Sequence, residues 1–310
     1  MAQPADSLAA ERPSSVAETP LSRARGLPDA ERASVAAMAA RLAPGEPAAA
    51  PDPLTIRQWL WGPGFHIPGT AEDVLELARP FAANAATRLL GVAAGLGGAA
   101  RAIAMQSGAY VSALERDPDL ARRGRALSIA AGRQKQVPVG HMDPETLELR
   151  AGAFDGIIGR EASHLVRDKE RFLRVLVLGV RPRGQLLLTE FVAEPALAGR
   201  PELAAWAALQ PREPSLWTLR QYSDCFLSLG VELRVPEDIS AAYKSWIVDG
   251  WVRLMRTVDL RSLPRGHRLA VVAEAERWMP TVAALDSGAL RLYRFHVVVG
   301  PVRGLGIVRR

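Results

Sequence analysis

Residues 88–98 read RLLGVAAGLGG, and this stretch decides the fold class. An apolar run over Arg88–Val92 meets a cluster of small residues, and Ala99–Gln106 then has the composition of a helix. A strand that turns through small residues into a helix lets a ligand approach the backbone closely. The start of the helix adds free N–H donors and the positive end of its dipole. The stretch therefore predicts a ligand site at the carboxyl end of a strand.

Strands and helices alternate along the residues that follow. Asp117-Pro118 starts a helix, because aspartate caps a helix and proline fits its first turn. Asp168–Leu178 is expected to be a second helix with its apolar residues on one face. The expected strands are 88–92, 110–114, 136–139, 154–158, 185–192, 231–235 and 290–300. Alternation of this kind requires crossover connections, so the sequence predicts a parallel, doubly wound α/β sheet.

Residues 1–50 differ in composition from the rest of the chain. Ala, Pro, Glu, Ser and Arg dominate this segment, and no aromatic residue precedes Trp59. Such a segment buries too little apolar surface to offset its ordering entropy, so we expect a flexible extension. One short helix is expected within it, over Asp29–Leu42. Pro51-Asp52-Pro53 marks the boundary to a domain that we expect over 51–310.

Charge and composition exclude several classes of protein. The chain has 310 residues and a net charge of +6, but its 39 basic residues are scattered and only three are lysines, so a nucleic-acid partner is not expected. Leu89–Ala100, the longest apolar run, is shorter than the roughly eighteen residues of a membrane span. The single cysteine, Cys225, excludes a disulfide framework within the chain and a cysteine-rich zinc site, and we expect no metal. Met1–Glu11 has no secretory signal, which favours a soluble cytoplasmic protein.

An acidic residue narrows the class of ligand. Glu115 stands twenty positions after Gly95, at the end of the next expected strand. A carboxylate in that place can accept hydrogen bonds from both hydroxyls of a ribose. The loop lacks the G-x-G-x-x-G dinucleotide fingerprint and also the lysine of a phosphate loop. S-adenosylmethionine remains, whose amino-acid tail lies over such a loop, and simple packing of glycines against a helix is the plain alternative.

Several motifs occur in the order typical of one family, and over about two thirds of its length the chain resembles the class I S-adenosylmethionine-dependent methyltransferases. The motifs are the loop 91–98, Glu115, Asp143, FDGII at 154–158, REASH at 160–164, DKERFL at 168–173 and RPRGQLLLTE at 181–190. Upstream, WGPGFHIPG at 61–69 is similar to the lid segment of the phosphoethanolamine and sarcosine-type N-methyltransferases. Within the class, the small-molecule enzymes are therefore the nearest.

The resemblance implies a fold and a division of the chain. We expect the Rossmann-like methyltransferase fold, with a mostly parallel seven-stranded sheet, an antiparallel last strand, and helical lid and insert segments. Residues 51–85 would form the lid and amino-terminal helices, and 86–192 the cofactor-binding core. Residues 193–285 would form a helical insert on the acceptor side, and 286–310 the final strand.

The resemblance also assigns cofactor-binding residues. The glycine loop would hold the methionine moiety, Glu115 the ribose, and Met142 and Asp143 the adenine, while Arg160 follows the fourth strand where donor and acceptor meet. The cofactor-binding residues expected for S-adenosylmethionine are Gly91, Ala93, Gly95, Leu96, Gly97, Gly98, Glu115, Arg116, Met142, Asp143 and Arg160.

Two residues after the fourth strand are the catalytic candidates. In the phosphoethanolamine enzymes a histidine at the position of His164 belongs to a catalytic dyad, although its tyrosine partner is not evident here and Trp59 and Trp61 lie in that region. Imidazole has a suitable unperturbed pKa for a general base. Glu161 is expected to orient the acceptor or contact the donor. The plain alternatives are that His164 only opens the following helix and that Glu161 lies on a helix surface.

The chain departs from the family pattern at three positions. Gly91 stands where the family usually carries an acid, Ala93 replaces the first loop glycine, and Phe191 replaces a common tyrosine. Loss of the acid's charge-assisted hydrogen bond would weaken cofactor binding by roughly 1.5–3 kcal/mol, or about ten- to a hundredfold.

Three functions follow as expectations. The first is methyl transfer to an amine or hydroxyl of a small-molecule acceptor, with His164 as general base. The second is a catalytically weak or inactive relative that serves as a binding or scaffold protein, which the missing acid at Gly91 supports. The third is an RNA or protein methyltransferase, and a homodimer is left open as the assembly.

Overall fold

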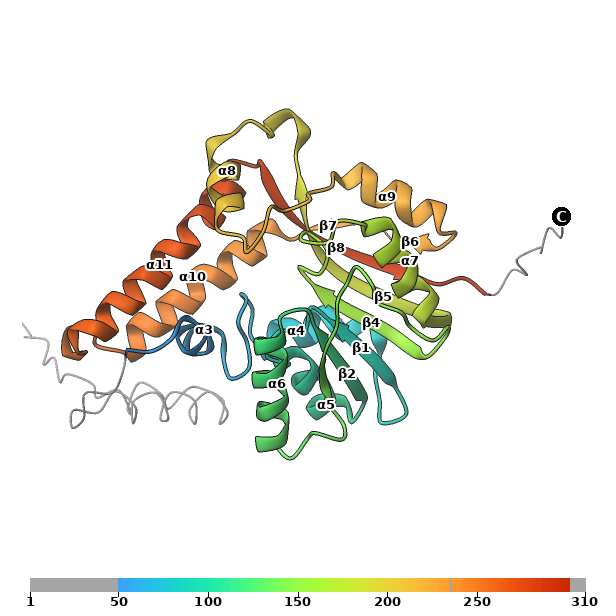
Figure 1. Ribbon diagram of the computed structural model, residues 1–310, viewed down its shortest axis with the longest axis horizontal. Coiled ribbons are helices and arrows are strands. Elements are labelled where there is room, and N and C mark those ends of the chain that lie inside the picture. Colours follow the sequence, from blue (N-terminus) through green and yellow to red (C-terminus); the bar gives the residue numbers. More distant parts are fainter. Residues whose placement is uncertain (1–49, 235, 302–310) are drawn as a thin grey trace, which may run out of the picture.

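The computed structural model describes residues 50–234 and 236–301 (Figure 1). The helix expected over Asp29–Leu42 lies outside the described residues. The helices are α3 Pro53–Trp61, α4 Ala71–Ala78, α5 Gly98–Ser107, α6 Pro118–Ala130, α7 Lys169–Gly179, α8 Pro201–Ala208, α9 Leu219–Ser228, α10 Ser240–Thr257 and α11 Arg265–Asp286. The strands are β1 Arg88–Val92, β2 Tyr110–Glu115, β3 Val139–His141, β4 Phe154–Arg160, β5 Val180–Ala193, β6 Glu232–Leu233, β7 Glu237–Asp238 and β8 Leu290–Val298.

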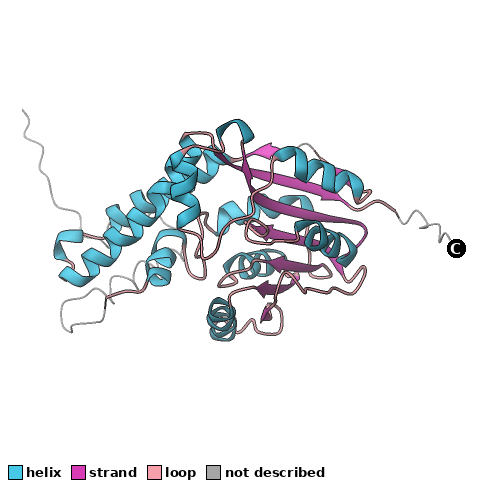
Figure 2. Cartoon of the chain, turned by 45° about the horizontal axis from the view of Figure 1, so that its top comes forward, coloured by secondary structure: helices cyan, strands magenta, loops and turns pink. Residues whose placement is uncertain are grey.

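One sheet runs through the molecule in the order β3-β2-β1-β4-β5-β8-β6, with β7 also paired to β8. The strands from β3 to β5 are parallel, and β8 runs antiparallel to β5 from Gln185↔Val298 to Ala193↔Leu290. The doubly wound, mostly parallel sheet with an antiparallel last strand is confirmed (Figure 2). Because β1 is central and its neighbours run in the same direction, its carboxyl end lies at the switch point where such sheets bind ligands.

The sheet has eight strands rather than the expected seven. Both β6 and β7 pair with β8, and Pro236, which lies between them, has no amide hydrogen to donate to a strand ladder. The strand expected over 185–192 also begins earlier than expected. Residues 181–184, whose sequence Arg-Pro-Arg-Gly has the composition of a turn, form an irregularity within β5. Phe154 pairs with Val180 and Gly156 with Gln185, so four residues of β5 have no counterpart on β4.

Alternating side chains cover both faces of the sheet. On β1, Leu89 points into a core with α4 and α5, whereas Leu90 and Val92 point into a second core with α7 and α9. A third core lies beyond the sheet, where α8, α10 and α11 pack around the end of β8. Figure 1 shows α10 and α11 side by side as two long helices that extend away from the sheet, with α3 packed against both.

Local signals place the helix starts beside the site. The Asp117 carboxylate caps α6 by accepting hydrogen bonds from the Asp119 and Leu120 amides, with Pro118 in the first turn. Asp168 caps α7 in the same way through the Arg171 amide. The expected helix starts at these two residues are therefore confirmed. These caps determine where the chain after β2 enters α6 and where the chain after β4 enters α7. They thereby determine which residues lie at the ligand-binding end of the sheet.

Candidate active site

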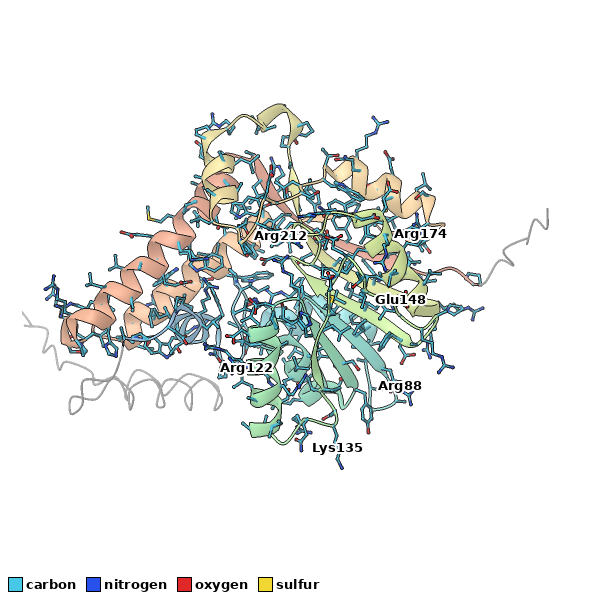
Figure 3. All side chains as sticks on the ribbon, in the orientation of Figure 1. Arg88, Arg122, Lys135, Glu148, Arg174 and Arg212 are labelled. Carbon is cyan, nitrogen blue, oxygen red and sulfur yellow. The ribbon has the colours of Figure 1, made fainter. Side chains whose placement is uncertain are left out.

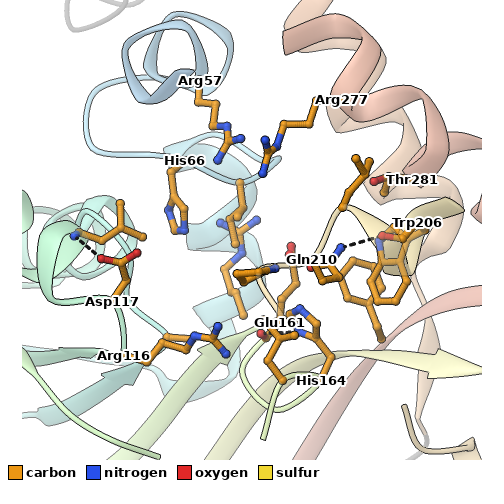
Figure 4. Close-up of a pocket in the computed structure, with 18 of the residues that line it drawn as sticks. Arg57, His66, Arg116, Asp117, Glu161, His164, Trp206, Gln210, Arg277 and Thr281 are labelled. Atoms are coloured by element: carbon orange, nitrogen blue, oxygen red, sulfur yellow. Dashed lines mark hydrogen bonds between the residues drawn. The ribbon is translucent and has the colours of Figure 1, made fainter. Parts of the chain in front are cut away.

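A cavity of about 370 Å³ opens at the carboxyl ends of the central strands (Figure 4). One wall consists of residues that follow the strands, including Ala93 after β1, Glu115 at the end of β2 and Arg160 at the end of β4. The opposite wall comes from helices α3, α8, α10 and α11 and includes Arg57, Trp206, Tyr243, Arg277, Trp278 and Thr281. Its volume lies within the range of about 300–1,000 Å³ that is typical of small-molecule sites.

The Glu115 carboxylate lines this cavity and holds the loop in place. It is 4% exposed, and it accepts hydrogen bonds from the Gly95 amide at 2.6 Å and from the Asp117 amide at 2.9 Å. Burial raises the pKa of this carboxyl, which the two amide bonds and the neighbouring Arg116 oppose. A carboxylate has about four lone-pair positions. Two of those on Glu115 therefore remain free for hydroxyl groups of a ligand.

The loop after β1 has a left-handed backbone at three positions. The φ angles are +50° at Ala93, +55° at Gly95 and +76° at Gly97. Glycine adopts these angles freely, whereas the Cβ of Ala93 costs about 1–2 kcal/mol. Gly91, by contrast, has room for a side chain, because a Cβ there would lie 3.8 Å from its nearest neighbour, the Ser112 carbonyl oxygen.

The lid segment, residues 61–69, lies directly over this loop. The Gly98 amide at the start of α5 donates a hydrogen bond to the Gly64 carbonyl at 3.0 Å. The imidazole of His66 packs against Gly95 so closely that a Cβ on Gly95 would lie 1.9 Å from its Cε1 atom. Ala93 is the loop residue that lines the main cavity. Ala93 and Gly98 also line a smaller cavity of about 30 Å³. Gly91, Gly95, Leu96 and Gly97, which the structure describes, line neither cavity.

A buried arginine ties the same loop to α6. The Arg101 side chain, 8% exposed, donates to the Leu96 carbonyl at 2.8 Å, to the Gly124 carbonyl at 3.3 Å and to the Ser128 hydroxyl at 3.2 Å. Without Arg101 the buried Leu96 carbonyl would lose this hydrogen bond, which is costly in the interior. Arg101 thus fixes the glycine loop from below while the lid covers it from above.

His164 is brought into the cavity in a defined tautomer. Its Nδ1 lies 3.0 Å from the Glu161 carbonyl oxygen, which only accepts, so Nδ1 carries the hydrogen and Nε2 carries a lone pair, and the Gln210 side chain is a further hydrogen-bond partner of the ring. Its ring stands edge-on to Phe191 and beside Trp206. Burial and the positive charge of Arg116 lower the pKa of His164 to about 4. The imidazole is therefore neutral at pH 7 and can accept a proton through Nε2.

Glu161 faces the same space from an unusual backbone position. Its φ angle is +55°, which is rare for a residue with a Cβ. Tyr243, from α10, donates its hydroxyl hydrogen to the Glu161 carboxylate at 2.8 Å. Burial raises the pKa of Glu161, and the positive charge of Arg160 opposes this. Arg160 itself is buried, donates to the Pro68 carbonyl of the lid and lies over the ring of Trp246.

A buried polar cluster supports the segment that carries these side chains. The Glu190 carboxylate, 0% exposed, accepts from the Ser163 amide at 3.0 Å and from the Ser163 hydroxyl at 2.8 Å, and that hydroxyl lies 2.7 Å from the Tyr222 hydroxyl. Burial raises the pKa of Glu190 to about 7. Ser163 lies between Ala162 and His164, so this cluster holds the turn after β4 in its position.

The predicted site residues thus divide into two groups. The structure brings Ala93, Glu115, Arg116, Arg160, Glu161 and His164 together around one cavity. It does not bring Met142 and Asp143 there. Met142 is buried in the core beside α7, and the exposed Asp143 accepts a hydrogen bond from the Glu145 amide. Their contact with adenine remains a prediction.

Sequence reasoning missed several residues of the far wall. Tyr243, Arg57 and Arg277 come from helices that carry no recognisable motif, and they meet the strand ends only through the tertiary fold. Trp206 from α8 and Trp278 from α11 also line the cavity. The one local signal was the aromatic spacing of Tyr243 and Trp246 on one face of α10.

Basic side chains outside the cavity are dispersed. Figure 3 shows Arg88, Arg122, Lys135 and Arg174 at separate places around the molecule. Within residues 50–234 and 236–301, no cluster of His, Cys, Asp and Glu is arranged to hold a metal ion. Over the same residues, none of the helices has the length and apolar character that crossing a membrane requires.

The comparisons with known proteins agree with this geometry. Residues 90–188 match the family model "Methyltransferase domain". Glycine/sarcosine/dimethylglycine N-methyltransferase of Actinopolyspora halophila is 29% identical over 107 residues, which is 34% of this chain and 19% of that protein. An uncharacterized protein of Mycobacterium tuberculosis is 30% identical over 176 residues, which is 50% of this chain and 63% of that protein. The chain thus spans less than two thirds of the length of either relative.

Solved structures share the fold. Phosphoethanolamine N-methyltransferase 2 of Haemonchus contortus, in complex with phosphomonomethylethanolamine and S-adenosylhomocysteine, has a TM-score of 0.69 at 17% identity, over 80% of this chain and 57% of that chain. A putative sarcosine dimethylglycine methyltransferase of Galdieria sulphuraria has a TM-score of 0.58 at 15% identity, over 74% of this chain and 85% of that chain. Residues 90–188 are therefore a methyltransferase domain, and the chain shares its fold with S-adenosylmethionine-dependent methyltransferases.

Proposed function

We propose that this chain transfers a methyl group from S-adenosylmethionine to an amine or hydroxyl of a small-molecule acceptor, inside the cavity between the strand ends and α10–α11. The single observation that carries the proposal is the Glu115 carboxylate. It faces the cavity at the end of β2, and two of its lone-pair positions are free beside a loop of small residues. A ribose with two adjacent hydroxyls fits that pattern of free acceptors.

When bound, the cofactor would supply a methyl group on a positively charged sulfur. A lone pair of the acceptor would bond the methyl carbon in line with the carbon–sulfur bond, which breaks to leave S-adenosylhomocysteine. The chain's own residues then have to align the acceptor and exclude water. The aromatic walls of Phe191, Trp206 and Trp278 exclude water from the inner cavity. The Glu161 carboxylate, held by Tyr243, can accept a hydrogen bond from an amine or hydroxyl and so orient its lone pair.

We assign His164 as the group that takes the acceptor's proton. Its Nε2 carries a lone pair, its ring is held by the Glu161 carbonyl, and it is neutral at pH 7. A base with a pKa of about 4 is weak, so it takes the proton only as the acceptor forms its new bond to the methyl carbon, which makes that proton acidic. The expected pH dependence of turnover therefore has its acid limb near pH 4 rather than near 6.5.

The lid must move for the cofactor to reach the loop. His66 packs on Gly95, and Gly64 accepts the Gly98 amide, so lid residues cover the backbone that would bind the methionine end. Burial, with the charges of Arg57 and Arg160, lowers the pKa of His66 to about 3. Within the described part of the chain this neutral ring has no hydrogen-bond partner, so it can leave its place without breaking a hydrogen bond or an ion pair.

Mass spectrometry on small-molecule extracts tests this proposal. The purified chain is incubated with S-adenosylmethionine and a cell extract depleted of protein, and products that gain one CH₂ are sought. The proposal predicts at least one such product, reduced strongly in His164→Gln. His296→Gln is the matched control, since His296 lies on β8 and its ring bonds Gln185. Binding of the cofactor without any methylated product would favour the inactive binding protein, for which the glycine at position 91 is the supporting observation.

A further inference from the structure

Two arginines from separate helices converge above the cavity. Figure 4 shows the guanidinium groups of Arg57, from α3, and Arg277, from α11, turned toward one another above the space that His66, Gln210 and His164 surround. Like charges repel, and such an arrangement is favourable when an anion lies between them. We infer that the methyl acceptor carries an anionic group, a carboxylate or phosphate, which is bound between Arg57 and Arg277; this inference rests on the proposed function.

Arg277 has no carboxylate of its own. Its side chain is exposed, and no acidic group lies within ion-pair distance in the part of the chain that the structure describes. Thr281 stands one turn further along α11, on the same face, and also lines the cavity. A guanidinium and a hydroxyl at this spacing offer several hydrogen-bond donors to one anion.

Arg57 is anchored so that one edge of its guanidinium remains available. Its Nε and Nη2 donate to the Glu274 carboxylate at 2.6 Å and 3.5 Å, which leaves Nη1 for a ligand, and the same carboxylate accepts from the Trp278 indole at 2.8 Å. Glu274 is 3% exposed and is not among the residues that line the cavity. It therefore holds Arg57 in position without competing for an anion inside the cavity.

The charge of the whole cavity favours an anionic acceptor. Four arginines line it, Arg57, Arg116, Arg160 and Arg277, against the three carboxylates of Glu115, Asp117 and Glu161. Glu274, behind the wall, offsets the charge of Arg57, so the charges of these side chains balance. The sulfonium of the bound cofactor would then leave an excess of one positive charge. An acceptor with an anionic end would offset this excess, whereas a cationic acceptor would increase it.

The apolar residues of the cavity indicate what the rest of the acceptor is like. Apolar side chains that line the cavity are Ile67, Leu165, Phe191, Trp206, Leu209 and Trp278. An acceptor with an anionic head, an apolar body, and an amine or hydroxyl near Glu161 fits this combination of surfaces.

Anion titrations followed by tryptophan fluorescence test the inference, because Trp278 lies 5.8 Å from the Arg57 guanidinium. Inorganic phosphate and acetate are the probes, each at ionic strength held constant with chloride. We expect saturable binding of at least one, weakened about tenfold or more in Arg277→Gln and largely retained in Arg277→Lys. Whichever probe binds more tightly identifies the head group as phosphate or carboxylate. Arg265→Gln is the matched control, since Arg265 is exposed on α11 and is not among the residues that line the cavity.

Three results would overturn the inference: no saturable binding of either anion, equal binding by Arg277→Gln and the unchanged chain, or equal weakening by Arg265→Gln. S-adenosylhomocysteine affinity is measured on the same proteins and should change less than about twofold in Arg277→Gln. Anion binding without S-adenosylhomocysteine binding counts against the proposed function. S-adenosylhomocysteine binding without anion binding counts against the anionic acceptor alone.

Discussion

Gly95→Ala tests the closest contact between the lid and the glycine loop. A Cβ at position 95 would lie 1.9 Å from Cε1 and 2.2 Å from Nδ1 of His66, so the imidazole must leave its place. The left-handed φ of +55° adds a cost of about 1–2 kcal/mol for any residue with a Cβ. With the lost contacts of the ring, we expect the free energy of unfolding to fall by about 2–4 kcal/mol.

Three further variants separate the backbone cost from the clash. Gly132→Ala has nearly the same φ, +65°, but no atom within 4 Å of its Cβ, so it reports the backbone cost alone. His66→Ala removes the ring, and in the double variant with Gly95→Ala the steric part of the loss should disappear. Urea unfolding followed by tryptophan fluorescence gives the free energy of unfolding of the parent chain and of each of the four variants. A coupling of about 1–2 kcal/mol between the two substitutions is expected. Strict additivity, or a Gly95→Ala loss equal to that of Gly132→Ala, would refute the lid contact.

The remaining predictions concern proton binding, loop support and the missing acid. The folded-state pKa of His164, about 4, is below its unfolded value, so its stabilisation is full above pH 6.5 and is lost as the pH falls toward 4. Between pH 6.5 and pH 4 the free energy of unfolding of His164→Gln should therefore fall by about 3 kcal/mol less than that of the parent chain. Urea unfolding at each pH measures this, and parallel pH profiles of the two proteins would contradict it. Arg101→Leu should lower the free energy of unfolding by at least about 2 kcal/mol by orphaning buried acceptors, whereas the exposed Arg122→Leu should change it by less than about 0.5 kcal/mol. Gly91→Asp should tighten S-adenosylmethionine binding by about ten- to a hundredfold in calorimetry, and an unchanged affinity would show that the acid is not needed here.

Local sequence signals predicted the fold well where neighbours in sequence decide the structure. The β1–loop–α5 unit and the caps at Asp117 and Asp168 depend on residues within a few positions of each other. The irregularity at 181–184 and the short strand β7 escaped prediction because both depend on pairing with distant strands. A Pro-Arg-Gly sequence has the composition of a turn whether or not a strand continues through it.

The site was predictable on its strand side and not on its helix side. Glu115, Glu161 and His164 follow strands, and parallel strand ends meet at one edge of a sheet, so their convergence follows from the topology. Tyr243 meets Glu161 across 82 positions of sequence, through the packing of α10. Arg57 and Arg277 converge only because α3 packs against α11. The closure of the lid over Gly95 likewise had no local signal.

The central claim is that the Glu115 carboxylate binds the ribose of an S-adenosyl ligand in this cavity. Calorimetric titration of S-adenosylhomocysteine into the full chain and into Glu115→Gln tests it most directly. The amide keeps the shape of the side chain but replaces one acceptor oxygen by a donor. We predict saturable binding to the unchanged chain and a loss of about ten- to a hundredfold in Glu115→Gln. No binding up to millimolar ligand, or equal affinity for both proteins, would contradict the claim.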